Sequence, residues 1–220
     1  MNKPLLIIGG PGNGSVIAEC IEDNRRRFND FEWEVTGFIN DFESDSIDGY
    51  PILGETKDIS ELAKKGFYFA WGIHLMQRNP FTQKFFYQLE IPLDRLATIV
   101  HKSAFVATSA EIGPGVFIMN NAYISPRVKL GLGTMVKSNA LIAHDVECGP
   151  LCHFAMGSIT GAYTRLGICA DVAIGCVVLE NRKIGNYAFA GAASLVSRDI
   201  PDYEIHVGSP AKFLKKVRLD

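Results

Sequence analysis

Two histidines in the second half of the chain, His144 and His153, have the chemistry of acid–base groups. His144 is followed directly by Asp145, whose carboxylate would favour the protonated imidazole and fix its tautomer. This pair suits a general base, and a solvated histidine at a turn accounts for it equally well. His153 lies nine residues further on, where the alternative is an ordinary surface histidine. We expect both side chains to face outward toward one surface groove.

A glycine-rich loop covers residues 9–14, between an apolar strand at 3–8 and a helix expected over 15–23. Glycines allow close backbone approach to a phosphate, and the helix N-terminus behind them favours an anion. The spacing is GxxGxG instead of the dinucleotide GxGxxG, and no Lys-Ser/Thr pair follows. Gly12 and Asn13 are therefore candidates for binding a nucleotide diphosphate, and the alternative is a tight turn that binds nothing.

Polar or small residues end the next two expected strands as well. Strand 34–39 leads into Asn40 and Asp41, and strand 66–71 leads into Gly72, before a helix expected over 75–89. Carboxyl ends of parallel strands meet at one sheet edge, where ligands usually bind. The segment is predicted to be a Rossmann-like βαβαβ unit, too short for two mononucleotide-binding halves.

A six-residue period runs through the rest of the chain and must position the histidines. Helices repeat near 3.6 residues and strands near 2, whereas hexapeptide repeats indicate a parallel β-helix. A sandwich of evenly spaced strands is disfavoured, since its loops would vary in length. The periodic residues are Val100, Val106, Ile112, Ile118, Ile124, Leu130, Val136, Ile142, Cys148, Phe154, Thr160, Leu166, Val172, Val178, Ile184, Ala190 and Val196.

Glycines repeat at three times that period, which predicts that three hexads form one coil of a triangular prism. We expect each of these glycines to provide a positive φ at the same corner of every coil. The ends of such a solenoid need covering, by the first domain and by the tail after Val196. The glycines are Gly113, Gly131, Gly149, Gly167 and Gly185.

The change of pattern near residue 95 predicts two domains, residues 1–95 and 96–220. The chain has 47% apolar residues and a net charge of −2, which argues against a nucleic-acid partner. No apolar run approaches the about 18 residues of a membrane span, and the start has no secretory-signal pattern, so we expect a cytoplasmic protein.

Five cysteines without a CxxC pair suit a reducing compartment. We expect Cys148, Cys152 and Cys176 to be small core residues, Cys20 to belong to the first helix, and Cys169 to face outward. The coils offer no third histidine at the level of His144 and His153, so no metal site is expected.

Taken together, these motifs resemble the hexapeptide-repeat nucleotide-sugar acetyltransferases of the bacillosamine, perosamine and sialic-acid O-acetyltransferase type. The likeness spans essentially the whole chain. It rests on the hexad array and on four segments, GGPGNG, FINDF, AHDVECGPLCHFAMG and SRDIPDYEIHVGSPAKFL, the last of which contains the VGxPAK-like ending.

The resemblance implies a left-handed β-helix in a homotrimer, with acetyl-CoA lying between neighbouring coil domains and a nucleotide sugar held mainly by the first domain. His144 matches the family's catalytic base and Asp145 the acidic residue that assists it. The other matches are His153, Gly161, Ala162 and Ala192 for the cofactor, and Gly12, Asn13, Asn40, Asp41 and Gly72 for the nucleotide sugar.

Three positions depart from the family pattern. Asn13 replaces a common histidine, Asn40 an acidic residue and Ala162 a glycine. The base, the sugar and the acylated position therefore stay open.

The sequence predicts direct N-acetylation, with His144 accepting the amine proton and a backbone N–H near Gly161 or Ala162 stabilising the oxyanion. The alternatives are O-acetylation of a sialic-acid-like sugar and a nucleotide-sugar-binding protein without chemistry.

Overall fold

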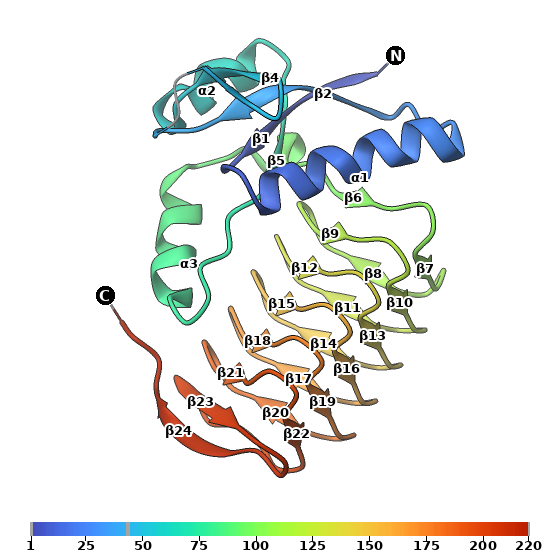
Figure 1. Ribbon diagram of the computed structural model, residues 1–220, viewed down its shortest axis with the longest axis vertical. Coiled ribbons are helices and arrows are strands. Elements are labelled where there is room, and N and C mark those ends of the chain that lie inside the picture. The colour runs from blue at the N-terminus through green and yellow to red at the C-terminus, as the bar shows by residue number, and fades with distance from the viewer. Residues whose placement is uncertain (1, 43–44, 220) are drawn as a thin grey trace.

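A small α/β unit stands on one end of a long stack of coils (Figure 1). The computed structural model describes residues 2–42 and 45–219. Within these residues no helix is long and apolar enough to cross a membrane. The boundary predicted at residue 95 falls at the end of a short 3-10 helix between the two parts, and stays a prediction.

The α/β unit contains a five-stranded sheet in the order β3-β4-β2-β1-β5. β1 pairs in parallel with β2 and β5, and β2 pairs in parallel with β4. The strands are β1 (Lys3–Ile8), β2 (Trp33–Ile39), β3 (Ser46–Ile47), β4 (Tyr50–Gly54) and β5 (Tyr68–Trp71). The helices are α1 (Asn13–Phe28), η1 (Thr56–Asp58), α2 (Ile59–Lys64), α3 (Asn79–Gln88) and η2 (Leu93–Arg95).

The predicted βαβαβ core is present, with three differences in detail. The sequence interpretation missed the β3–β4 hairpin, whose turn residues Asp48 and Gly49 have φ 49° and 83°, as Asp-Gly hairpin turns require. α1 is longer than predicted and ends at Phe28, where Asn29 takes a left-handed conformation. α3 begins four residues later than predicted, with Pro80 in its first turn.

The coils form three parallel ladders, which we call the first, second and third faces. The first face contains β6 (Ile99–Val100), β9 (Phe117–Ile118), β12 (Met135–Val136), β15 (His153–Phe154), β18 (Asp171–Val172) and β21 (Phe189–Ala190). The second contains β7 (Phe105–Val106), β10 (Tyr123–Ile124), β13 (Leu141–Ile142), β16 (Ile159–Thr160), β19 (Val177–Val178) and β22 (Leu195–Val196). The third contains β8 (Glu111–Ile112), β11 (Lys129–Leu130), β14 (Glu147–Cys148), β17 (Arg165–Leu166) and β20 (Lys183–Ile184).

The predicted inward residues fill the core of this left-handed β-helix. Large positions such as Ile142 and Phe154 are fully buried and form one cluster with the small residues between them. Cys148, Cys152 and Cys176 belong to this cluster, as expected. Cys169 does not face solvent as predicted. It is 2% exposed because the α/β unit covers it.

The glycines spaced by eighteen residues serve a different purpose from the one predicted. None of the five has a positive φ, which occurs two residues later at positions such as Gly133 and Leu151. Instead the coils approach closely there: a Cβ on Gly131 would lie 2.5 Å from the carbonyl carbon of Gly149. Glycine is therefore required by contact between coils and not by backbone conformation.

The α/β unit is fastened to the coil by polar contacts. The Asn24 amide donates to the Val100 carbonyl (3.0 Å) and accepts from the Lys102 N–H (2.8 Å). His101 lies 3.0 Å from Asp23 of the same helix. Figure 1 shows α1 across the top of the coil and α3 beside the first face. At the opposite end, β23 (Glu204–Val207) and β24 (Lys212–Lys216) extend the first face and cover the last coil.

Candidate active site

His144 lies at the corner between β13 and β14, where the second and third faces meet. Its Nδ1 is 2.7 Å from Asp145 Oδ2, and the imidazole is 46% exposed. Arg127, one coil earlier, donates to both carboxylate oxygens of Asp145, from Nε at 2.7 Å and from an Nη at 2.8 Å. These hydrogen bonds, first from Arg127 and then from His144, hold the pKa of Asp145 well below its usual range.

This corner has the geometry of a general base. Because Asp145 stays ionised, it can accept the Nδ1–H of His144, which leaves the basic lone pair on Nε2 of a half-exposed imidazole. The predicted pairing of the two residues is confirmed as a contact. Arg127 was missed, although its position eighteen residues before Asp145 puts it at the same corner of the preceding coil.

Gly161 and Ala162 occupy the same corner one coil further on, beside Tyr163, whose ring centroid is 5.2 Å from that of His144. The Gly161 N–H donates to the Val178 carbonyl at 2.8 Å, so it is not free to stabilise an oxyanion as predicted. The sequence interpretation named the Ala162 N–H as the other donor, and that assignment stays a prediction.

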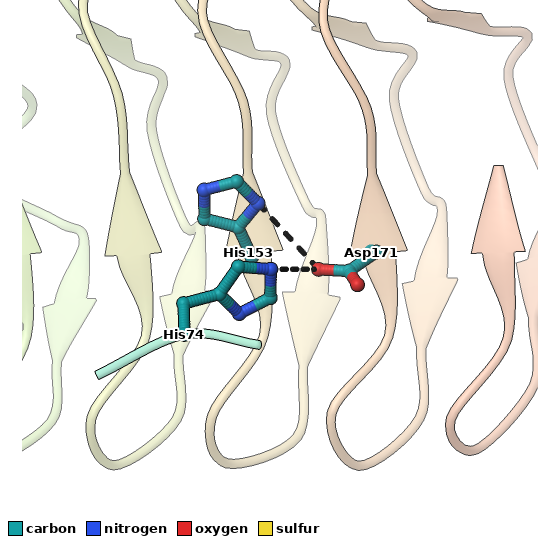
Figure 2. Close-up of side chains that lie close together, drawn as sticks. All are labelled: His74, His153 and Asp171. Carbon is teal, nitrogen blue, oxygen red and sulfur yellow. Dashed lines mark ion pairs between the residues drawn. The ribbon is translucent and has the colours of Figure 1, made fainter. Parts of the chain in front are cut away.

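His153 occupies a second site, on the first face, and Figure 2 shows it beside His74 and Asp171. The two imidazole rings stack with centroids 4.0 Å apart. Asp171 Oδ1 lies 3.2 Å from His74 Nε2 and 3.5 Å from His153 Nδ1. Asn79 of α3 donates to the other oxygen at 2.9 Å. His153 points out of the coil as predicted, but His74 covers it and leaves it 9% exposed.

The charges of this cluster follow from its burial. Burial lowers the pKa of His74 to about 4, so this imidazole is neutral at pH 7. Burial also acts to raise the pKa of Asp171, but His74, His153 and Asn79 outweigh it, and the pKa lies below its ordinary value. The result is a buried carboxylate next to two imidazoles, one from the α/β unit and one from the coil.

The same three side chains have the composition of a metal site, since one ligand atom from each lies within 4.8 Å of the others. The sequence argument against a metal considered only the coils, and the third ligand, His74, comes from the α/β unit. The imidazole rings stack with an angle of 19° between their planes, and one nitrogen of each ring lies near the same oxygen, Asp171 Oδ1. Asp171 Oδ1 lies close to both imidazoles but accepts no hydrogen bond within residues 2–42 and 45–219, so the structure shows close electrostatic contact with Asp171 at this site.

A pocket of about 490 Å³ opens on the first face beside this cluster. Its wall is mostly apolar, with polar groups at the end near the α/β unit. Ala192 lines it, and its predicted contact with the cofactor stays a prediction. The polar lining residues are Asn13, His74, Gln77, Lys137 and His153.

A second pocket, of about 310 Å³, lies at the carboxyl edge of the small sheet and is lined by Asn40, Asp41 and the glycine loop. Both polar side chains also have structural contacts: Asn40 Nδ2 donates to the Gly9 carbonyl (2.9 Å), and Asp41 accepts from the Thr56 N–H (2.7 Å). Gly72 is required by packing, because a Cβ there would lie 2.9 Å from the Ile8 carbonyl oxygen.

Gly12 and Asn13 do not line this second pocket. Gly12, with φ 105°, precedes α1 in open space. Asn13 faces the pocket on the first face instead.

The predicted site residues therefore fall on two sides of the coil. His144, Asp145, Gly161 and Ala162 lie at the corner opposite the first face, whereas His153 and Ala192 lie along the first face. The expectation that both histidines of one chain face one groove is wrong. In a three-strand coil, nine residues is half a turn, which carries the chain from that corner to the opposite face.

Fold and site together define a class: a Rossmann-like unit on a left-handed β-helix of hexapeptide repeats, with histidine–carboxylate pairs on the coil surface. Comparisons with known proteins agree. Residues 4–76 match the PglD N-terminal domain. The acetyltransferase domain of PglB from Neisseria gonorrhoeae, solved with acetyl coenzyme A, is 26% identical, with a TM-score of 0.85 over 97% of this chain and 100% of that one.

Two further relatives support the same resemblance. A perosamine N-acetyltransferase from Caulobacter crescentus, solved as a histidine mutant with CoA and GDP-perosamine, has the same fold, with 24% identity and a TM-score of 0.83 over 97% of each chain. A dTDP-3-amino-3,6-dideoxy-α-D-galactopyranose 3-N-acetyltransferase from Aneurinibacillus thermoaerophilus is 44% identical over 43 residues, which span 20% of this chain and 22% of that relative. The resemblance to nucleotide-sugar acetyltransferases is confirmed.

Proposed function

We propose that the protein transfers the acetyl group of acetyl-CoA to the amino group of a nucleotide-linked amino-deoxy sugar. The observation that carries the proposal is the His144–Asp145 pair, 2.7 Å apart at an exposed coil corner. The relatives named above support the choice of donor and acceptor. Two of them are N-acetyltransferases of sugar nucleotides, one of these solved with CoA and GDP-perosamine, and the third is an acetyltransferase domain solved with acetyl-CoA.

In the proposed reaction the acceptor nitrogen attacks the thioester carbonyl carbon directly. His144 Nε2 takes the proton lost by the amine, and Asp145 stabilises the resulting imidazolium through Nδ1. The tetrahedral intermediate then expels the CoA thiolate, which the imidazolium can reprotonate. No enzyme nucleophile is required, so no covalent enzyme intermediate forms.

A homotrimer would bring the two halves of the site together. Three copies around one axis can place the corner of one coil, with His144, Gly161 and Ala162, against the first face of the next, with His153 and Ala192. Acetyl-CoA would lie in the groove between them. The proposed reaction consumes acetyl-CoA, and all five cysteines are free. Both features fit a protein of the cytoplasm.

The pocket at the edge of the small sheet would hold the nucleotide. Its position next to the glycine loop lets the diphosphate pass the N-terminus of α1 and lets the sugar reach the pocket on the first face. This path would be shaped by the side chains of Asn13, Asn40 and Asp41 and by the backbone at Gly12 and Gly72.

The proposal is tested with an acceptor panel. Purified protein is mixed with acetyl-CoA and UDP-, dTDP- or GDP-linked amino sugars, and with CMP-linked and free sialic acid, while CoA thiol release is followed. We expect release with an amino-sugar nucleotide and identify the N-acetyl product by mass spectrometry. Release only with a sialic acid would mean that the acceptor group is a hydroxyl and not an amine. No release with any acceptor would contradict acetyl transfer.

A further inference from the structure

Lys137 is a charged residue of the pocket that neither the proposed chemistry nor the sequence interpretation uses. It follows β12 on the first face, is 4% exposed, and lines the 490 Å³ pocket together with Asn13 and His153. Few lysines are buried to this degree unless their ammonium group has a partner.

The Lys137 ammonium has more N–H donors than hydrogen-bond acceptors around it in the described residues. Nζ donates to Asn13 Oδ1 at 2.7 Å and lies 5.4 Å from the centre of the Phe117 ring. An ammonium has three N–H donors. No carboxylate among residues 2–42 and 45–219 forms an ion pair with it. The carboxylate of Asp171 is occupied by His74, His153 and Asn79.

A buried ammonium without a counter-charge is costly. Burial lowers the pKa of Lys137 to about 8, so the amine still carries a proton at pH 7. An anionic oxygen entering the pocket would remove that cost by accepting from the free N–H groups. Hydrogen bonds of this kind, between two charged partners, are about twice as strong as neutral ones.

The surroundings of Lys137 indicate where such an anion would come from. The glycine loop separates the two pockets: Gly10 and Pro11 line the nucleotide pocket, whereas Asn13 lines the pocket with Lys137. The loop after β5 also borders both pockets: Ile73 lines the nucleotide pocket, and His74 lines the pocket with Lys137. A ligand that spans both pockets therefore passes the start of α1 and the Lys137 ammonium.

We propose that Lys137, held by Asn13, is an anion-binding residue for the acceptor, taking an oxygen of its diphosphate or of a carboxylate on its sugar. The inference rests on the proposed function only for the nature of the acceptor. Binding without acetyl-CoA tests it, so a failure of catalysis and a failure of this subsite are distinguishable.

The experiment compares the wild-type protein with Lys137→Met and measures affinities by calorimetry at low salt. Methionine is an unbranched apolar side chain only one atom shorter than lysine, and it removes the buried charge, so the variant should unfold at the same or a higher temperature. Lys129→Met is the matched control, because Lys129 pairs with Glu111 on the third face, at 3.3 Å. The ligands are UDP, dTDP, GDP, their monophosphates, and the UDP-glucose and UDP-glucuronate pair.

If the ammonium binds the diphosphate, Lys137→Met lowers the affinity for the nucleoside diphosphates and UDP-glucose by about 10- to 100-fold, and it lowers the affinity for the monophosphates less. If it binds a sugar carboxylate, the loss is confined to UDP-glucuronate. Lys129→Met leaves every affinity unchanged in both cases. A Lys137→Met protein that binds the whole panel as the wild type does, or a wild type with no affinity for any member, would overturn the proposal.

Discussion

At the scale of single residues, the protein uses two histidine–carboxylate pairs in contrasting surroundings. His144 and Asp145 are adjacent in sequence and lie at an exposed corner with Arg127. His153 and Asp171 are directly paired on neighbouring strands of the first face and are covered by the α/β unit. An exposed imidazole can exchange protons with a substrate, whereas the covered one is suited to holding a fixed contact.

Sequence reasoning found the first pair because its members are neighbours in the chain. Asp171 stands eighteen residues after His153, so the coil period itself could have identified this second pair. His74 and Lys137 could not be assigned in this way. Their roles depend on how the α/β unit docks on the first face, which no periodicity in the sequence encodes.

His74 should make the stability of the protein depend on pH. Unfolded histidine binds a proton below about pH 6.5, whereas folded His74 stays neutral until pH falls to about 4. The unfolded state therefore takes up more protons in this window, and the stabilisation present above pH 6.5 is lost as the pH falls toward 4. For this largely buried group the loss is on the order of 3 kcal/mol.

Denaturant unfolding of the wild type and of His74→Gln, at several pH values between 4 and 7.5, measures this contribution. The free energy of unfolding should fall more steeply with decreasing pH in the wild type than in the variant. Parallel curves for the wild type and His74→Gln would contradict a neutral buried His74.

At the scale of secondary-structure elements, the hexad period predicted the coil strands because each short strand supplies one inward residue at every sixth position. The period predicted where the glycines lie but not why they are needed, since φ angles and distances between coils are not visible in a sequence. The β3–β4 hairpin was missed although Asp48-Gly49 is a strong turn signal. Its strands are too short, at two and five residues, to display a clear alternation.

Gly131→Ala should destabilise the coil, because the new methyl group would lie 2.5 Å from the backbone of Gly149. Overpacking of this kind costs about 1 to 3 kcal/mol, and here rigid backbone must move. Gly157→Asn is the matched control, since its site is open and asparagine tolerates its φ of 65°. Thermal unfolding should show a clear fall in Tm only for Gly131→Ala. Equal Tm values would mean that the coils can separate without cost.

At the scale of the whole molecule, each chain contains two groups of candidate site residues that cannot meet. The corner with His144 is opposite the first face, where His153, Ala192 and the large pocket lie. Sequence reasoning placed His144 and His153 in one groove because it followed a single chain. In the proposed trimer the groove exists, but between two chains.

Mixed oligomers test this arrangement. His144→Ala removes the corner half-site, and Ala192→Trp fills the pocket on the first face, so each variant alone should be inactive. After co-refolding of equal amounts, about a quarter of the sites should combine two intact halves, and activity should recover to about that fraction. Mixing without subunit exchange is the control. No recovery after verified exchange would place the whole site within one chain.

The central claim is that His144 is the base that accepts the amine proton. Its most direct test is kcat for CoA release by His144→Ala, measured against the wild type at saturating acetyl-CoA and acceptor. We predict a fall of about 100- to 10,000-fold, because the base is lost, with the acceptor still bound at an unchanged Kd. A His144→Ala enzyme with near wild-type kcat would contradict the account.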